Sequence, residues 1–324
     1  MKQVVLEQPG LLVREDADAP SPGPGEALLR VHRVGVCGTD FHAFHGRQAF
    51  FSYPRIMGHE LAAEIVSVPA NDQGLSVGDR CTVEPYLNCG KCRPCHEGHY
   101  NNCEDIRVLG VHTDGGMREF LPVPLDHVFT SSQLTFDQLA VVEPLSIGAQ
   151  AVERSGLSAE EFLVVVGAGP IGVAISQLAV AAGARVRIIE TNPHRRERLR
   201  GLNMEVCEES NDESADVVID ATGNPDSMAR CFSRARFGGR VVWVGIVKGA
   251  VPVDDPLFHH RELTLYASRN SCGHFPRIIR MIENGEINTS IWITNRLALE
   301  DVPEQFENVI RHQGLKTIID VMKH

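Results

Sequence analysis

Four cysteines in the first third of the chain have the spacing of a metal site. They fall within fifteen residues as Cys-x2-Cys-x2-Cys-x7-Cys, at Cys89, Cys92, Cys95 and Cys103. Four thiolates can surround a zinc ion tetrahedrally, and such a closed shell is structural because it leaves no position open for a substrate. The alternative is four unligated thiols in a loop whose polar neighbours indicate solvent exposure, where thiols oxidise readily. His96 and His99 lie in the same loop as alternative ligands, but the four-sulfur set is simpler and predicts a structural zinc.

A second set of metal donors is dispersed along the chain. It consists of one thiol, one imidazole and two carboxylates, at Cys37, His59, Glu60 and Glu143. These are the donor types of a catalytic zinc, which keeps one position open for water or a substrate oxygen. Each residue alone is more commonly a buried core residue. Together, and ahead of a nucleotide-binding motif, they predict a second zinc with a catalytic role.

The third motif is the glycine-rich segment Gly167-Ala-Gly-Pro-Ile-Gly172. It lies between an apolar run at 162–166, expected to be a strand, and an apolar helix expected at 170–182. In such a loop Gly167 makes the tight turn, Gly169 lets the backbone approach a pyrophosphate, and Gly172 permits close packing of helix on strand. Pro170 and Ile171 belong to the same loop, so we expect all five residues in a dinucleotide site.

Glu190 stands twenty-one residues after Gly169, at the end of the next expected strand. A carboxylate there accepts hydrogen bonds from the ribose hydroxyls of NAD and repels the additional phosphate of NADP. The alternative for Glu190 is a surface acid at the start of a helix. Arg195, with Arg196 and Arg198, could receive that phosphate, form a solvated helix face or cover the adenine.

The elements around these motifs change character along the chain. The first 140 residues or so read as short strands separated by turns, at 27–34, 62–68, 80–83 and 118–123, which is typical of an antiparallel barrel or sandwich. From residue 161 strands and helices alternate, which predicts a parallel sheet covered by helices on both faces. Further strands are expected at 185–189, 204–207, 216–221, 240–245 and 262–267, with helices at 193–199 and 226–236.

Two segments depart from a regular alternation. Only eight residues, 208–215, connect two of the expected parallel strands, whereas such a crossover normally needs a dozen or more, so we expect no proper helix there. The tail reads as helices at 275–284 and 301–311 and a strand at 317–321, which we expect to return to the first domain.

Length and charge narrow the classes of function. The 324 residues suffice for about two domains. A formal net charge of -11 and the lack of a long basic run argue against nucleic acid or an anionic membrane as a partner. The sequence contains no apolar run of the ~20 residues that a membrane span needs, and its start does not read as a signal peptide. We therefore expect a cytoplasmic protein.

These segments, in this order, resemble the zinc-containing medium-chain alcohol and polyol dehydrogenases over essentially the whole chain. The matching segments are Gly35-Val-Cys-Gly-Thr-Asp40 with His42, Gly58-His-Glu60, the four-cysteine segment, Asp114-Gly-Gly116, Glu143-Pro144, the glycine-rich loop and Asp220-Ala-Thr-Gly223. The resemblance implies an α/β protein with a GroES-like, β-rich catalytic domain at 1–147 and 271–324. A Rossmann domain with a doubly wound parallel sheet would occupy 148–270 and bind NAD, with Thr222 beside the cofactor.

The resemblance also implies roles for the dispersed donors. Cys37 and His59, with Glu143 or Glu60, would hold the catalytic zinc, and Thr39 and His42 occupy the positions of the family's proton relay. Glu143 stands where other alcohol dehydrogenases carry a cysteine, which favours the sorbitol-dehydrogenase-like branch. Two departures, Ala63 and Pro69 in place of glycines common in the family, suggest local repacking and leave the donors untouched.

The reaction that follows is the oxidation of a secondary alcohol, or the reduction of the matching ketone. Zinc would lower the pKa of the substrate hydroxyl so that hydride can pass to NAD. Arg269 and Asn270 follow the last expected strand, where family members approach the substrate, and they favour a polyol or a sugar acid. An interdomain salt bridge is the alternative for Arg269. The rival functions are a dehydrogenase of simple alcohols and a catalytically silent NAD-binding relative, which would be expected to lose the zinc donors. We also expect a homodimer or homotetramer.

Overall fold

The computed structural model describes residues 1–201, 204–209, 214–311 and 314–322. The chain forms two compact units. The first unit comprises Met1–Glu143, Phe275–Gly285 and Thr289–His324, and the second comprises Pro144–His274 with Glu286–Asn288. The first unit is thus interrupted in sequence by the second. The predicted domain boundaries at 147/148 and 270/271 stay a prediction.

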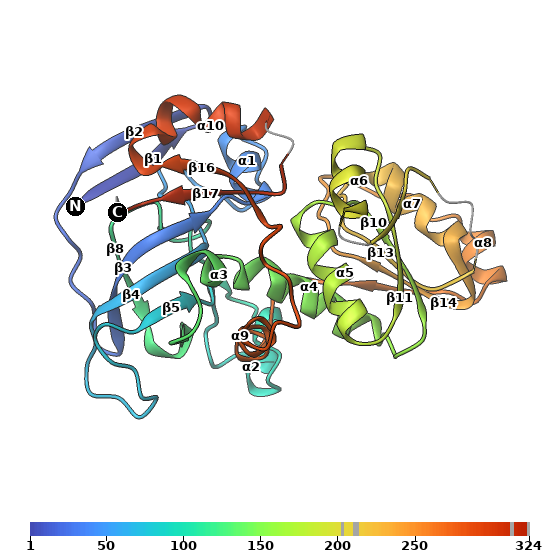
Figure 1. Ribbon diagram of the computed structural model, residues 1–324, viewed down its shortest axis with the longest axis horizontal. Helices are drawn as coiled ribbons and strands as arrows, with labels where there is room; N and C mark the ends of the chain where they lie inside the picture. Colours follow the sequence, from blue (N-terminus) through green and yellow to red (C-terminus); the bar gives the residue numbers. More distant parts are fainter. Residues whose placement is uncertain (202–203, 210–213, 312–313, 323–324) are drawn as a thin grey trace. The chain divides into compact units, whose positions relative to one another are not determined.

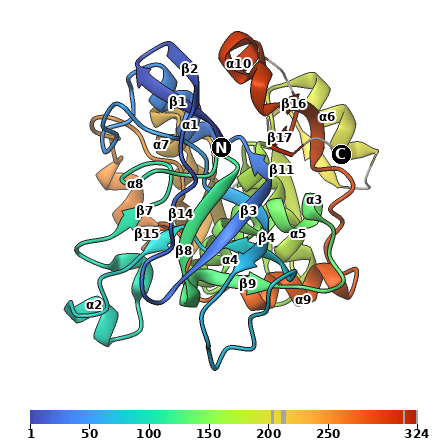
Figure 2. The ribbon, with the colours of Figure 1, turned by 90° about the vertical axis from the view of Figure 1, so that its left-hand side faces the viewer.

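The first unit is built on a largely antiparallel sheet. Its strands run in the order β16-β17-β3-β4-β5-β9, and β8 also pairs with β3. They are β3 (Glu26–Gly35), β4 (Glu60–Ser67), β5 (Arg80–Val83), β8 (Phe120–Pro124), β9 (Val128–Thr130), β16 (Ile293–Ala298) and β17 (Lys316–Asp320). Figure 2 shows β3, β4 and β8 side by side, as their antiparallel registers require. Strand β17 pairs antiparallel with β3, so the tail returns to the first unit as predicted.

Shorter elements complete the first unit. The paired strands β1 (Lys2–Gln8) and β2 (Leu11–Asp16), and β6 (Tyr86–Leu87) and β7 (Arg107–Val108), form two separate ribbons. The helices are α1 (Gly38–Phe44), α2 (Arg93–His96), α3 (Phe136–Ala140), α9 (Phe275–Glu283) and α10 (Val302–Arg311), with short 3-10 turns at Tyr100–Asn102, Leu125–His127 and Leu299–Asp301. The sequence patterns do not indicate α1, α2 or α3, because each spans at most two turns.

A network of alternating charges holds the C-terminal strands against the sheet of the first unit. The Arg33 side chain on β3, which is buried, donates from Nε to Asp137 of α3 (3.2 Å) and lies 2.9 Å from Asp320 at the end of β17. Arg296 on β16 pairs with both aspartates, at 3.0 Å to Asp320. The network fixes the position of β17, and with it the residue at its start, Lys316.

The second unit contains a parallel sheet in the order β12-β11-β10-β13-β14-β15, which is the doubly wound order of a Rossmann fold. Its strands are β10 (Phe162–Val166), β11 (Arg185–Ile189), β12 (Glu205–Cys207), β13 (Ala215–Asp220), β14 (Ala235–Trp243) and β15 (Thr264–Ala267). Its helices are α5 (Pro170–Ala181), α6 (Pro193–Arg200), α7 (Pro225–Arg234) and α8 (Asp255–His260), and α4 (Val142–Ser155) begins in the first unit. Helix α5 packs on β10 and β11, and α7 packs on β13 and β14 (Figure 1).

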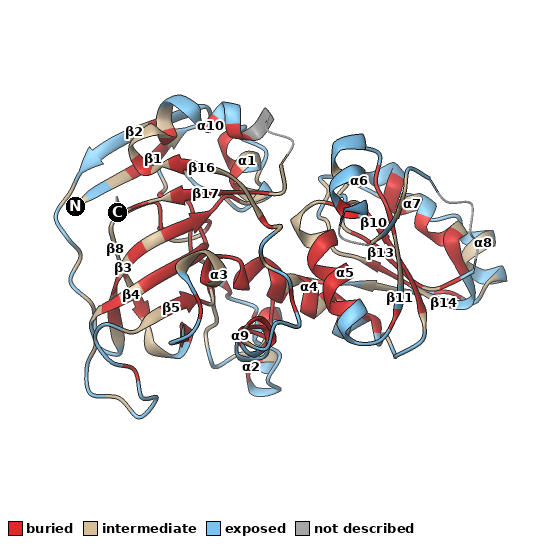
Figure 3. Cartoon of the chain, viewed as in Figure 1, coloured by how far each residue is buried: buried red, intermediate tan, exposed pale blue. Residues whose placement is uncertain are grey.

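The central position of β10 explains its composition. All five residues of this strand are buried, as Figure 3 shows, because helices cover the sheet and leave no solvent face. The α/β fold and the Rossmann unit are confirmed. Within the described ranges, no helix combines the length and apolar character needed to cross a membrane.

Three predicted elements need correction. Strand β14 begins at Ala235 rather than at 240, since the chain passes directly from α7 into a strand whose register with β13 shifts between Ala215 and Val217. Helix α7 accordingly ends at Arg234 rather than at 236. The strand expected at 118–123 begins at Phe120. In the short connection at 208–215, residues 210–213 lie outside the described ranges, so the prediction for that crossover stays a prediction.

Candidate active site

The dispersed donors of the first unit come together at the ends of β3 and β4. Donor atoms of Cys37, His59 and Glu60 all lie within 4.8 Å of one another. Gly35 at the end of β3 pairs with Glu60 at the start of β4. Cys37 follows β3 directly and precedes α1, so the antiparallel register brings the thiol, the imidazole and the carboxylate to one edge of the sheet.

Asp40 supports two of these donors from the first turn of α1. Its carboxylate accepts a hydrogen bond from the Cys37 backbone N–H (2.9 Å), and its Oδ1 lies 4.0 Å from His59 Nδ1. Both side chains are buried. Burial alone would lower the pKa of His59, but the facing Cys37, Asp40 and Glu143 raise it well above its ordinary value. The imidazole therefore lies in strongly negative surroundings.

Glu60 is held by a buried lysine from the far end of the chain. Lys316 Nζ donates to both carboxylate oxygens of Glu60 at 2.6 Å, and to the Val36 carbonyl oxygen at 3.1 Å. Each side chain of the pair is only 1% exposed. Gly35 makes room for the carboxylate, since a Cβ there would lie 2.0 Å from a Glu60 oxygen. Burial alone would lower the pKa of Lys316, but Glu60 and Cys37 raise it above its ordinary value.

Glu143 supplies a second buried carboxylate. The Tyr86 hydroxyl donates a hydrogen bond to Glu143 Oε1, and both side chains are buried. Burial raises the pKa of the Glu143 carboxyl to about 7, although His59 lowers it. Glu143 thus lies near the imidazole, while the set of donor atoms within 4.8 Å is formed by the other three residues.

The two predicted relay residues lie on α1. The Thr39 hydroxyl is 3.7 Å from Cys37 Sγ, so the helix start brings it to the donor group. His42 lies one turn further along and is exposed to solvent. The helix therefore links the donor group to the surface.

The donor group fits a zinc ion on its own chemistry. Three carboxylates (Asp40, Glu60, Glu143) and one thiol are gathered with Lys316, and burying charge without compensation is costly. His59 Nδ1 and Asp40 Oδ1 are buried and lack a hydrogen-bond partner. A divalent cation among these donors offsets the excess negative charge, and the thiol–imidazole–carboxylate set is one that zinc prefers.

The four-cysteine cluster forms a second site in the first unit. Its four sulfur atoms lie within 4.8 Å of one another, with Cys92 and Cys95 3.4 Å apart. Backbone N–H groups lower the pKa of Cys89 to about 7, whereas burial raises that of Cys103 to about 11. The polar residues around the cysteines predict that the thiols are exposed to solvent. This prediction is wrong for Cys95 and Cys103, which are buried. Four converging sulfurs fit a closed zinc shell.

The glycine-rich loop of the second unit has the shape that its sequence predicts. Gly167 has φ +95°, which disfavours any side chain, and a Cβ on Gly172 would lie 1.8 Å from the Gly167 carbonyl oxygen. A Cβ on Gly169 would meet nothing within 4 Å, so open space adjoins the start of α5. Pro170 is the first residue of that helix, followed by Ile171. Thr222 closes the other side, since its methyl group would lie 2.8 Å from a Cβ on Gly167.

Glu190 is a built part of this unit rather than a surface acid. It is buried, and its two carboxylate oxygens accept hydrogen bonds from the backbone N–H groups of Ala168 and Asn192, each at 2.8 Å. Arg195 Nη1 lies 3.7 Å from the same carboxylate. Arg196 donates to the carbonyl oxygens of Glu190 (2.8 Å) and Thr191 (2.7 Å), and to Glu208 at 3.0 Å.

The two predicted substrate residues follow β15 in the second unit. Arg269 is exposed, and Asn270 is half-buried with a left-handed φ of +53° and an amide nitrogen without a hydrogen-bond partner. Their role toward a substrate stays a prediction.

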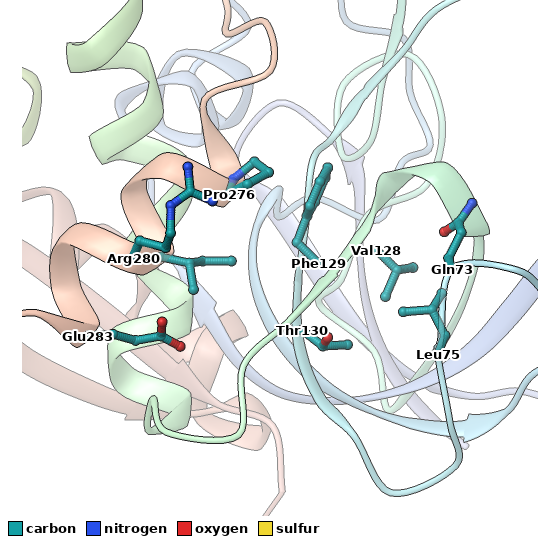
Figure 4. Close-up of a pocket in the computed structure, with 9 residues that line it drawn as sticks. Gln73, Leu75, Val128, Phe129, Thr130, Pro276, Arg280 and Glu283 are labelled. Atoms are coloured by element: carbon teal, nitrogen blue, oxygen red, sulfur yellow. The ribbon is translucent and has the colours of Figure 1, made fainter.

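A separate cavity of about 410 Å³ opens in the first unit between α9 and β9 (Figure 4). Phe129, Arg280 and Glu283 are among the side chains around it. None of the described residues that line it belongs to either metal-donor group.

Comparison with known proteins agrees with both sites. The family described as "Alcohol dehydrogenase GroES-like domain" matches residues 23–133, and "Zinc-binding dehydrogenase" matches residues 170–284. L-galactonate-5-dehydrogenase of Escherichia coli is 38% identical over 330 residues, which cover 97% of each chain. The chain is a zinc-type medium-chain dehydrogenase.

Further dehydrogenases are similar to this chain in sequence or in fold. Sorbitol dehydrogenase of Bacillus subtilis is 28% identical over 98% of this chain and 97% of its own. The alcohol dehydrogenase RspB of E. coli CFT073, solved with NADH, superimposes with a TM-score of 0.92 at 26% identity and 99% coverage of both chains. A zinc-binding dehydrogenase of Sinorhizobium meliloti, solved with NADP, gives 0.93 at 27% identity, again over 99% of both.

Three residues of the dehydrogenase's candidate site are not predicted from the sequence: Asp40, Tyr86 and Lys316. Asp40 lies inside the segment that carries Cys37, and that proximity is a usable signal. Tyr86 precedes the first cysteine of the cluster by three residues, which says nothing about Glu143. Lys316 is the first residue of the buried strand β17, and only the pairing of β17 with β3 brings it to Glu60.

We expect Lys316→Met to lower the free energy of unfolding of the chelator-treated dehydrogenase by about 3–5 kcal/mol, because Glu60 then stays buried without its cation. Urea titration followed by Trp292 fluorescence in a Trp243→Phe background reports on the first unit, and the exposed Lys248→Met serves as the control. Adding Glu60→Gln should recover part of the loss. Equal losses in the single and double variants would contradict a role in charge compensation.

Proposed function

We propose that this enzyme transfers hydride between NAD and the carbon that bears an internal secondary hydroxyl of a polyol or sugar acid, with the sugar acid preferred. The observation that carries the proposal is the cluster of half-buried Cys37 with buried His59 and Glu60, beside the buried Glu143 carboxyl that raises the pKa of His59. A zinc ion at this group supplies a Lewis acid that lowers the pKa of the substrate hydroxyl. The cysteine cluster would hold the structural zinc, and Asp40 would orient His59, as outer carboxylates do for ligating histidines.

The proton of the alcohol would leave along α1. The Thr39 hydroxyl can accept one proton while donating another, and it lies beside Cys37. His42 is exposed on the same helix, where it can pass the proton to solvent. Glu60, fixed by Lys316, would contribute negative charge beside the metal.

The second unit supports NAD rather than NADP as the cofactor. Gly167, Gly169 and Gly172, with Pro170 and Ile171, would receive the pyrophosphate, and Thr222 would border it. Two backbone N–H groups hold the Glu190 carboxylate in place for the ribose hydroxyls. Arg195 lies near this carboxylate, and Arg196 is engaged by two carbonyl oxygens and Glu208, so neither is placed as a dedicated phosphate partner.

The assignment of a polyol or sugar acid as the substrate is supported by the chemistry of three side chains. Glu143, where other family members carry a thiolate, and the polar pair Arg269 and Asn270 suit a hydroxylated substrate better than an aliphatic alcohol. Arg269 can bind a carboxylate bidentately. L-galactonate-5-dehydrogenase acts, by its name, on a sugar acid. The homodimeric or homotetrameric state and the cytoplasmic location stay predictions.

We expect two zinc ions per chain with different resistance to chelation. The four-sulfur shell is closed and should retain its zinc under mild chelation, while the catalytic site has an open position and should release its zinc first. Metal analysis of freshly purified protein, before and after dialysis against a mild chelator, measures this. One zinc or none in the fresh protein would contradict the proposed function.

NAD should be preferred over NADP by at least tenfold in kcat/KM, because a charged hydrogen bond to the ribose contributes ~1.5–3 kcal/mol. Glu190→Ser should narrow the gap, and Glu197→Gln on the exposed face of α6 is the matched control. Equal kcat/KM for the two cofactors in the unmodified enzyme would overturn the assignment.

The substrate assignment is tested by comparing a sugar acid with the corresponding neutral polyol. Arg269→Ala should reduce kcat/KM for the acid by the equivalent of about 2–5 kcal/mol and leave the polyol nearly unaffected, as expected for loss of a charge-assisted pair. Arg230 is an exposed arginine of α7, and Arg230→Ala is the control for the loss of one positive charge elsewhere on the second unit. An equal loss on both substrates, no loss, or a preference for simple alcohols would refute the assignment.

A further inference from the structure

The four cysteines lie in the segment that connects β6 to β7, which we call the four-cysteine lobe, and these two strands form a two-stranded ribbon at its base. Strand β6 ends two residues before Cys89, and β7 begins four residues after Cys103. The strands pair antiparallel, Tyr86 with Val108 and Leu87 with Arg107. Whatever fixes the four sulfurs therefore fixes the two ends of this ribbon.

The first strand of the ribbon begins at a residue that contacts one of the catalytic donors. Tyr86 is 5% exposed, and its hydroxyl donates to Glu143 Oε1. The carboxylate is oriented by a side chain that belongs to the base of the lobe.

The second strand runs on to the backbone beside His59. Leu109 N–H donates to the Pro85 carbonyl oxygen (3.0 Å) and keeps the ribbon closed. A Cβ on Gly110 would lie 2.7 Å from Gly58 N, so the chain after β7 packs directly on the residue before His59. The Gly116 N–H donates to the Gly58 carbonyl oxygen at 2.9 Å.

We propose that Tyr86 is a positioning residue of the catalytic metal site, and that the β6–β7 ribbon transmits the state of the four-cysteine lobe to that site. The proposal rests on the proposed function in placing Glu143 at the catalytic zinc. An outer hydrogen-bond partner that orients a metal-site carboxylate typically changes metal affinity or activity 10–100-fold when removed. A lobe without its zinc no longer fixes the ribbon, and the phenol then no longer holds the carboxylate.

Tyr86→Phe removes the hydroxyl and keeps the ring that packs in the core. The measurement is the release of zinc from the fully loaded enzyme into a chromogenic chelator. We expect one of the two zinc ions to leave about 10–100-fold faster in Tyr86→Phe and the other to leave at its original rate. The KM for NAD should not change, because its residues lie in the second unit. Tyr100→Phe, an exposed tyrosine of the same lobe, should release both ions as the unmodified enzyme does.

Cys92→Ser tests the transmission. Opening the lobe should speed the release of the catalytic zinc in the otherwise unmodified chain, but should add little in the Tyr86→Phe background. Multiplicative effects of the two changes would show that the lobe and the phenol act separately, and would overturn the proposal. Should Tyr86→Phe not be recovered folded, Cys92→Ser decides alone, and unaltered release of the remaining zinc contradicts the proposal. A loaded enzyme with two zinc ions and unchanged release in Tyr86→Phe contradicts only this inference, whereas a single zinc contradicts the proposed function.

Discussion

The first unit is organised around an excess of buried negative charge. The carboxylates of Asp40, Glu60 and Glu143 and the thiol of Cys37 gather around His59, with Lys316 as the buried cation that pairs with Glu60. Burial of such charges is unfavourable unless each is paired, hydrogen-bonded or bound to metal. A zinc ion bound by these donors would make this arrangement favourable, and the surrounding elements hold the donors close together.

Several features of the fold follow from that need. Gly35 lacks a side chain where the Glu60 carboxylate passes. Strand β17 crosses back to β3 and brings Lys316 to the same point, and the charge network of Arg33, Asp137 and Asp320 keeps that strand in place. The site thus depends on segments separated by up to 280 residues in sequence. Its integrity and the docking of the C-terminal strand are coupled physically.

The parts of the site that the sequence predicts are those whose residues lie close together along the chain. The cysteine spacing and the glycine-rich loop each lie within about fifteen residues, and the chemistry they predict depends on little beyond that window. Glu190 is found by its distance from the loop and by the apolar strand before it. The dispersed donors are grouped by their types, by their order ahead of the glycine-rich loop and by resemblance to a family, because nothing local joins Cys37 to His59 or Glu143. Lys316 and Tyr86 stay invisible, since their partners are set by the pairing of β17 and by the path of β6, which propensity does not specify.

The proposed function assigns one sulfur of this chain to a catalytic zinc and four sulfurs to a second, structural zinc. Zinc X-ray absorption of the loaded protein counts sulfur neighbours at ~2.3 Å directly. Cys89, Cys92, Cys95 and Cys103 with Cys37 make five sulfurs for two zinc ions, a mean of about 2.5 per zinc. Cys37→Ser should lower that mean to about 2 with both ions retained, as four sulfurs over two zinc ions require. An unchanged sulfur count in Cys37→Ser, or a single zinc with four sulfurs in the unmodified protein, would contradict the account.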